Sequence, residues 1–430
     1  MAKNDSMERE SPYRDIVEQL LDNASFLWIL RENCGRILGF SANDQSDYEL
    51  RLENQLDALM HHFEDAWAMS KDALQFNNAS DCFVCSVLAF RSMDSQYIEW
   101  ILNIISKNRE LLKGLISAMA WLPKALVEEW LSKFIQSKDL FHKEIAAHVY
   151  RLRGDDSGAF LKTLIERGDC IQNTPLHVQC IRIIGEFKRF DLLNDVILFC
   201  KDDRESVAFW AKYSAVLLGK KEYASSLYEY VLSENEWQRH AVNIVFRSVS
   251  IQDARALIAD MIAKKLEVET VLHALKVLGD PQAIPWIISQ MENVQVSRLA
   301  GHVFSTITGI SLDERELVLN IDEIKKEDLL DDFEDDDYQG DGSQGKGFDV
   351  DECENVSWPD VAKIKIIWQK YSHLFPAGQR LYLGKIILFD ELFRLYKQTS
   401  MSEKRGLALE LALIKANDNM LSPKSRVSAS

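Results

Sequence analysis

A turn residue recurs after an apolar helix end about every 31 residues, and this repeat restricts the possible folds more than any other feature. The separations between successive positions are 31, 34, 31, 29 and 30 residues, and the positions are Gly154, Gly185, Gly219, Ser250, Gly279 and Gly309. The spacing fits two helices of about a dozen residues and two short turns. Neither helix of such a pair can bury its apolar stripe alone. We therefore predict an all-α fold, in which helix pairs stack into an α-solenoid over residues 101–312.

In one repeat unit, the residues that end and begin helices can be identified. Gly279 suits the left-handed conformation that ends a helix, and Asp280-Pro281 begins the next one. The first helix of the unit is predicted over Ala283–Met291 and the second over Val296–Thr306. The second helix carries its apolar residues at helical spacing, which gives it one buried stripe.

The regions on either side of the repeat are also predicted to be helical. Helices over Tyr13–Arg36 and Tyr48–Lys71 fall outside the repeat register, so residues 1–100 are predicted to cap the solenoid. Residues 358–430 are predicted to form a small helical module. It contains a helix over Asp360–Tyr371 and, after Gly378, a helical stretch to about Ala416.

The charge is concentrated in one segment. Residues 327–354 hold thirteen acidic residues and one basic residue, a local charge of −12 in a chain of net charge −17, which leaves −5 elsewhere. Such a segment buries too little apolar surface to offset its ordering entropy, so residues 313–357 are predicted to be an acidic flexible linker. The balance also argues against a phosphate-tracking nucleic-acid binder, which needs clustered Lys and Arg.

Other features of the sequence indicate the compartment. No apolar run is long enough to span a bilayer, and the first fifteen residues are polar and acidic, unlike a secretory signal. Seven cysteines are an odd number and favour reduced thiols. We expect a cytoplasmic protein that does not contact a membrane.

The order of several motifs resembles that of known proteins. These motifs are Phe26-Leu27-Trp28, Ala118–Pro123, Phe209–Gly219, Gly279-Asp280-Pro281 with Pro285-Trp286, Trp358-Pro359 and Gly378–Gly384. The chain resembles HEAT-like repeat proteins and, more narrowly, an uncharacterised bacterial family. The resemblance implies a gene neighbourhood, because members are often encoded near type VI secretion spike components, but no mechanism. Ser250 departs from the usual glycine, and many surface positions carry Lys and Glu where relatives carry Ala and Arg.

Three motifs could in principle carry chemistry. Cys82 and Cys85 form a CxxC in an apolar helix without the further ligands that zinc needs, so they fit a helix core better than a redox or metal site. Residues 335–341 resemble the start of a calcium loop, but Lys346 stands where a bidentate glutamate belongs. His61-His62 does not form an HExxH motif. We predict no catalytic residues, no metal and no cofactor.

Function is therefore expected to lie in protein binding. The resemblance implies that the second helix of each pair lines the concave face, and this places six candidate partner-binding residues there: Gln179, Arg182, Tyr213, His273, Lys276 and Arg298. The leading hypothesis is a non-enzymatic scaffold, an adaptor or assembly factor for a type VI secretion system or its effector.

Two alternatives stay open. The first is a cytoplasmic immunity-type inhibitor of a toxic effector, whose acidic segment would mimic nucleic acid. The second is a HEAT-like enzyme with lyase or DNA-repair activity. A DNA-repair version would need a basic groove, which the charge balance does not favour.

Overall fold

The computed structural model describes residues 12–155, 158–319, 352–399, 401–415 and 418–421. Almost all secondary structure in these residues is helical, which confirms the all-α prediction. The described residues divide into two compact units, one within 1–35 and 41–183 and the other within 36–40 and 184–421. Within the described helices, none is long and apolar enough to cross a membrane.

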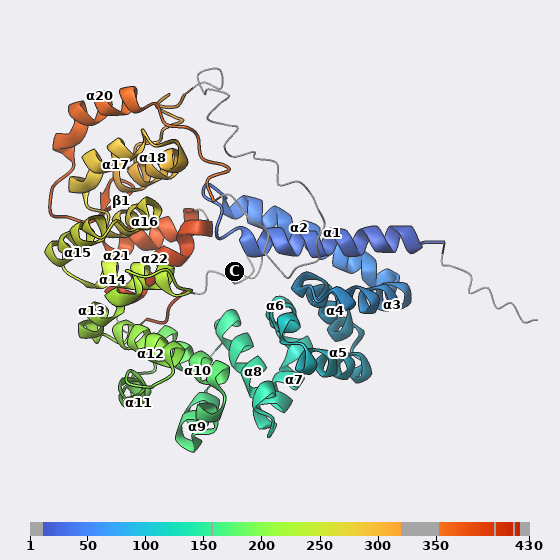
Figure 1. Cartoon of the computed structure of the whole chain (residues 1–430). Coiled ribbons are helices and arrows are strands. Elements are labelled where there is room, and N and C mark those ends of the chain that lie inside the picture. The colour runs from blue at the N-terminus through green and yellow to red at the C-terminus, as the bar shows by residue number, and fades with distance from the viewer. Residues whose placement is uncertain (1–11, 156–157, 320–351, 400, 416–417, 422–430) are drawn as a thin grey trace, which may run out of the picture. The chain divides into compact units, whose positions relative to one another are not determined.

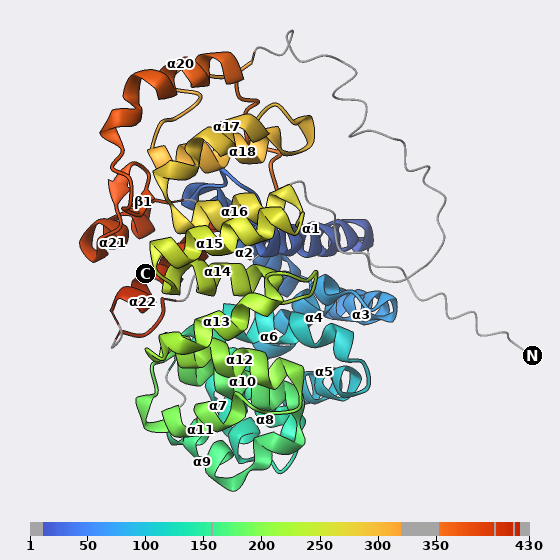
Figure 2. The same cartoon turned by 60° about the vertical axis from the view of Figure 1, so that its left-hand side comes forward.

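The first unit is built from antiparallel helices around one apolar core. Its elements are α1 (Arg14–Asn33), α2 (Ala42–His61), α3 (Phe63–Ala73), α4 (Ala79–Ser92), α5 (Ser95–Lys107), α6 (Leu112–Trp121), α7 (Lys124–Gln136), α8 (Leu140–Arg153), α9 (Ala159–Arg167) and most of α10 (Thr174–Glu186). Helix α4 is the centre of the core, because it contacts α1, α5 and α6 and nearly all of its residues are buried. It lies between α1 and α5 (Figure 2). The Trp28 ring stacks on Phe83 of α4 at 5.6 Å.

The helix predicted over Tyr48–Lys71 is two helices in the structure. Helix α2 begins earlier than predicted, where Ser41 and Asp44 form a reciprocal capping box. The break falls at His62, whose backbone leaves the helical region with φ −118° and ψ 39°. The His62 ring lies 5.1 Å from the Tyr13 ring. Apolar spacing alone did not reveal this break, because the buried stripe continues on both sides of it.

The second unit contains helices that pack in an alternating pattern. Its elements are α11 (Leu193–Phe199), α12 (Glu205–Leu217), α13 (Ala224–Leu227), α14 (Gln238–Ser248), α15 (Ile251–Ala263), α16 (Val268–Leu278), α17 (Ile284–Gln290), α18 (Val294–Thr308), α20 (Val361–Tyr371), α21 (Phe389–Gln398) and α22 (Met401–Ile414). Neighbours in sequence pack as pairs, α15 on α16 and α17 on α18. The second helices of successive pairs also pack together, so α14 contacts α12 and α16, and α16 contacts α18 (Figure 1).

The repeat positions differ in what they do. Gly154, Gly279 and Gly309 end α8, α16 and α18 in the left-handed conformation, as predicted. Gly185 instead lies inside α10, where a Cβ would clash with Ser214 of α12. Ser250 begins α15 as its N-cap and accepts from the Asp253 amide. The absence of a Cβ at Gly185 therefore allows close helix packing rather than a helix end.

The stretch after Gly378, which the sequence predicts as helical, contains a short hairpin. Strands β1 (Leu381–Tyr382) and β2 (Lys385–Ile386) pair antiparallel. The Leu381 amide donates to the Gly279 carbonyl at 2.7 Å, and the Leu383 amide donates to the Thr306 carbonyl at 2.6 Å. The hairpin thus satisfies carbonyls at the ends of α16 and α18, which have no partner within their own helices.

Candidate functional site

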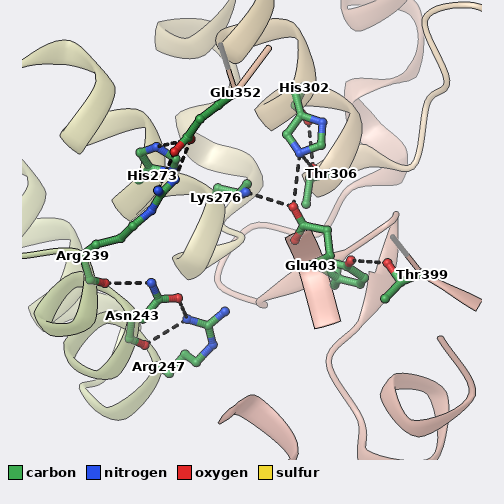
Figure 3. A network of polar contacts seen from close by, with 11 residues as sticks. Arg239, Asn243, Arg247, His273, Lys276, His302, Thr306, Glu352, Thr399 and Glu403 are labelled. Atoms are coloured by element: carbon green, nitrogen blue, oxygen red, sulfur yellow. Dashed lines mark hydrogen bonds and ion pairs between the residues drawn. The ribbon is translucent and has the colours of Figure 1, made fainter. Parts of the chain in front are cut away.

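The second helices of three successive pairs in the second unit carry polar residues that face one another. Helix α14 presents Arg239, Asn243 and Arg247, helix α16 presents His273 and Lys276, and helix α18 presents Arg298, His302 and Thr306. Within each helix these residues are three or four positions apart, which places them on one face. Figure 3 shows most of them pointing into a common network with Glu352 and Glu403. We call this surface the cationic face.

Glu403 of α22 lies at the centre of the cationic face. Its Oε1 is 2.9 Å from Lys276 Nζ and 3.2 Å from His302 Nε2 (Figure 3). The side chains of Glu403 and Lys276 are only 13% and 15% exposed. Burial alone would raise the pKa of Glu403, but Lys276 and His302 outweigh it and hold this pKa well below its usual range. The carboxylate is therefore ionised, and His302 donates to it from Nε2.

Glu352 binds to the α14 end of the cationic face. Its two carboxylate oxygens accept from the two terminal nitrogens of Arg239 at 2.5 and 2.6 Å, a bidentate pair. The hydrogen bond to Glu352 raises the pKa of Arg239. His273 Nε2 lies 4.0 Å from the same carboxylate. Burial, followed by the charges of Lys276 and Arg239, lowers the pKa of His273 well below its usual value, so its imidazole is neutral.

Glu410 of α22 binds two further guanidinium groups. Arg380 donates to both of its oxygens at 2.7 Å, and Arg247 Nε lies 3.1 Å from Oε2. Arg380 also donates to the carbonyls of Val277 and Leu278 at the end of α16. Burial lowers the pKa of Arg247. Glu403 and Glu410 are seven residues apart on α22, so both fall on the helix side that meets the cationic face.

The six predicted partner-binding residues fall into different places. His273 and Lys276 belong to the network, and Arg298 lies beside it, where it donates to the Cys353 carbonyl at 3.1 Å and covers the Trp358 ring. Tyr213 of α12 is buried, with its ring 5.2 Å from that of Trp210. Gln179 and Arg182 lie on α10 within the first unit, and Gln179 accepts from Arg151 at 2.9 Å.

Sequence reasoning missed the residues that complete the network. Arg239, Arg247 and His302 occupy the same register as the predicted set and could have been found by extending it. The three carboxylates were missed because they come from other parts of the sequence: Glu352, Glu403 and Glu410. The seven-residue spacing of Glu403 and Glu410 on a predicted helix was the available signal.

The other candidate motifs can be placed as well. Cys82 and Cys85 are buried in α4 as free thiols, and burial raises the pKa of Cys82 to about 12. The calcium-like stretch 335–341 lies outside the described residues, as does most of the acidic segment 327–354. In the part of the chain that is described, no three His, Cys, Asp or Glu side chains gather as a metal-ligand set.

The geometry of the cationic face can bind carboxylates that are carried on polypeptide. Each of the three glutamates meets at least two nitrogen groups. The partners come from separate elements: α14 and α16 for Glu352, α16 and α18 for Glu403, and α14 and the segment just before β1 for Glu410. Comparison with family models, curated proteins and solved structures gave no match to this chain.

Proposed function

We propose that the chain is a non-enzymatic protein-binding scaffold whose cationic face recognises acidic segments of polypeptide. One observation carries this proposal: the face already holds two carboxylates of the chain itself, those of Glu352 and of Glu403 on helix α22. Ion pairs from several helices to one carboxylate give orientation and specificity as well as attraction.

An α-solenoid of HEAT-like pairs is part of the proposal. Its support is the packing of α14 on α12 and α16, and of α16 on α18, which places successive second helices side by side. A surface built from second helices extends as pairs are added, and this suits the binding of extended or helical partners. Following the resemblance of the motifs, we propose that the partner is a type VI secretion spike component or an effector, met in the cytoplasm.

A matched pair of charge reversals tests the proposal. Arg239→Glu changes the cationic face, whereas Lys264→Glu changes an exposed lysine just after α15 that pairs with Asp260. The tagged full-length chain would be purified from a bacterium that encodes a type VI secretion system, and bound proteins quantified by mass spectrometry. We expect a secretion component or effector in stoichiometric amount with the wild type and Lys264→Glu, and its loss with Arg239→Glu.

Two results would contradict the proposal. Equal retention by both variants would place binding away from the cationic face. The second result is that no stoichiometric partner is recovered although circular dichroism shows that all three proteins are folded. This result would contradict the scaffold function itself.

A further inference from the structure

The first unit contains a pocket of about 420 Å³ between α1, α6 and α8. This volume falls in the range of about 300–1,000 Å³ that is typical of small-molecule sites. Leu112, Ile116 and Leu152 contribute apolar surface to its wall. The pocket is separate from the cationic face, since every residue that lines it belongs to the first unit.

Charged groups of one sign dominate the lining of the pocket. Four arginines and one lysine line it, against two glutamates, although the whole chain carries a net charge of −17. Two of the arginines are held by glutamates buried behind them: Arg31 by Glu49 at 3.1 Å, and Arg109 by Glu144. Such pairs fix the guanidinium groups before any ligand arrives, so less conformational entropy is lost on binding.

His148 of α8 is the second observation that indicates a ligand. It lines the pocket, and it makes no hydrogen bond or ion pair with any residue in the described part of the chain. Burial, followed by the charges of Arg151, Arg182 and Arg109, lowers the pKa of His148 to about 3. A neutral imidazole surrounded by cations offers one N–H donor and one acceptor, and neither finds a partner among the residues that the structure describes.

We propose that this pocket binds a small organic anion, with an oxyanion group, carboxylate or phosphate, at His148 and its apolar part against Ile116 and Leu152. Guanidinium groups bind both oxyanions with charge-assisted hydrogen bonds, so the shared chemistry is a planar or tetrahedral group of oxygens. An anion at this position would also stabilise the protonated form of His148, which the surrounding cations now disfavour.

Two exposed lysines in the first unit provide a matched comparison. Lys113 lines the pocket, is 62% exposed and lies over the Trp28 ring. Lys133 of α7 is outside the pocket, is 53% exposed and lies over the Trp130 ring. Both also pair with a glutamate. Lys113→Gln and Lys133→Gln therefore remove the same charge from similar surroundings, and only the first change affects the pocket.

The experiment is calorimetric titration of the full-length wild type and both variants with inorganic phosphate and with citrate, at constant ionic strength. We expect saturable 1:1 binding of at least one probe, weakened about fivefold by Lys113→Gln and by less than twofold by Lys133→Gln. Binding of phosphate alone would identify a phosphate ligand, and binding of citrate alone would identify a carboxylate ligand. Binding of both probes would show that the oxyanion is recognised without discrimination.

A spectroscopic measurement locates the bound probe. With histidines labelled at Cε1, and the His148 signal assigned through His148→Gln, the probe that binds should raise the pKa of His148. Three results would overturn the proposal. They are equal weakening by the two lysine variants, a His148 signal unaffected by a bound probe, and no saturable binding at about 10 mM of either probe, where even a Kd of about 1 mM would be nearly saturated.

Discussion

Lys188 Nζ lies 2.8 Å from the carbonyl oxygen of Ala412 and donates to it, although the two residues are 224 positions apart. The same ammonium group donates to the carbonyl of Leu217 at the end of α12. Both carbonyls lie in the last turn of a helix, where no intrahelical donor is left. One cation therefore joins the ends of α12 and α22, and it is itself buried.

Lys188 should make stability depend on pH in alkaline solution. Burial lowers the pKa of Lys188 from 10.5 to about 8. Between these values the unfolded chain binds more protons at this position than the folded chain does, so the free energy of unfolding should rise with pH. The full effect is about 3 kcal/mol. Urea unfolding at pH 7 to 10 should show this rise in the wild type relative to Lys188→Met. Parallel curves for the two proteins would contradict it.

Glu403→Gln should destabilise the second unit. The substitution leaves Lys276 and His302 without their carboxylate, and breaking a largely buried ion pair costs about 3 kcal/mol. Chemical denaturation at pH 7 measures the loss. Glu391→Gln is the control, because Glu391 pairs with the exposed Lys385 and should change stability by less than about 1 kcal/mol. Equal losses of unfolding free energy for the two variants would show that the buried Glu403 ion pair stabilises the protein no more than an exposed one.

The Glu403 effect should also disappear in acid. The pKa of Glu403 lies below its unfolded value, because Lys276 and His302 outweigh the cost of burial. Its contribution is therefore complete above the unfolded pKa of about 4.3 and is lost as the pH falls through the folded pKa. The difference in unfolding free energy between wild type and Glu403→Gln should shrink below about pH 4. A constant difference from pH 7 to pH 3 would exclude this electrostatic origin.

Two glycine substitutions should separate backbone strain from steric clash. Gly219 and Gly309 have positive φ angles of 90° and 70°. A Cβ at Gly219 would meet nothing within 4 Å, whereas one at Gly309 would clash with the carbonyl of Leu383. Gly219→Ala should cost about 1 kcal/mol, and Gly309→Ala at least about 2 kcal/mol more.

Hydrogen exchange provides the local check on the glycine pair. The amides of Leu383 and Gly384 donate to carbonyls near the end of α18. They should exchange faster in Gly309→Ala and stay protected in Gly219→Ala. Equal stability losses, with unchanged protection of both amides, would mean that the hairpin does not depend on this contact.

Thiol labelling should distinguish a structural CxxC from a reactive one. Six of the seven cysteines are buried, and Cys353 is partly exposed. Burial raises the pKa of Cys82 to about 12, so its reactive thiolate is scarce at neutral pH. A thiol reagent should label one cysteine rapidly in the native protein and none in Cys353→Ser. Rapid labelling of Cys82 or Cys85 would favour a redox function for the pair.

Sequence patterns predicted local features better than contacts between distant elements. The all-helical content and the helix ends at Gly279 and Gly309 followed from apolar spacing and glycine chemistry. Gly185 was misread because close helix packing and a left-handed helix end both require a residue without Cβ. The hairpin at 381–386 was not predicted, since strands of two residues carry no periodic signal and depend on the ends of α16 and α18.

Only the residues that the second helices contribute to the candidate site could be predicted, and not the carboxylates that meet them. The motif resemblance implied that second helices line a binding surface, and on that basis His273 and Lys276 were expected on one face. Nothing local to Lys276 points to Glu403, which is 127 positions away. Pairing across such a separation is decided by how α22 packs, and a single sequence contains no direct record of that packing.

The hairpin has a consequence for how the chain can change in length. Leu381 contacts the end of α16, and Leu383 contacts the end of α18, one helix pair further on. Arrays of repeats commonly gain or lose whole pairs, because each pair contacts only its neighbours. Here the hairpin contacts the ends of both α16 and α18, and its length matches the spacing between these two helix ends. Insertion or deletion of a helix pair between Gly279 and Gly309 would leave one end of that hairpin without its partner, so we expect the number of helices here to be constrained by the C-terminal segment.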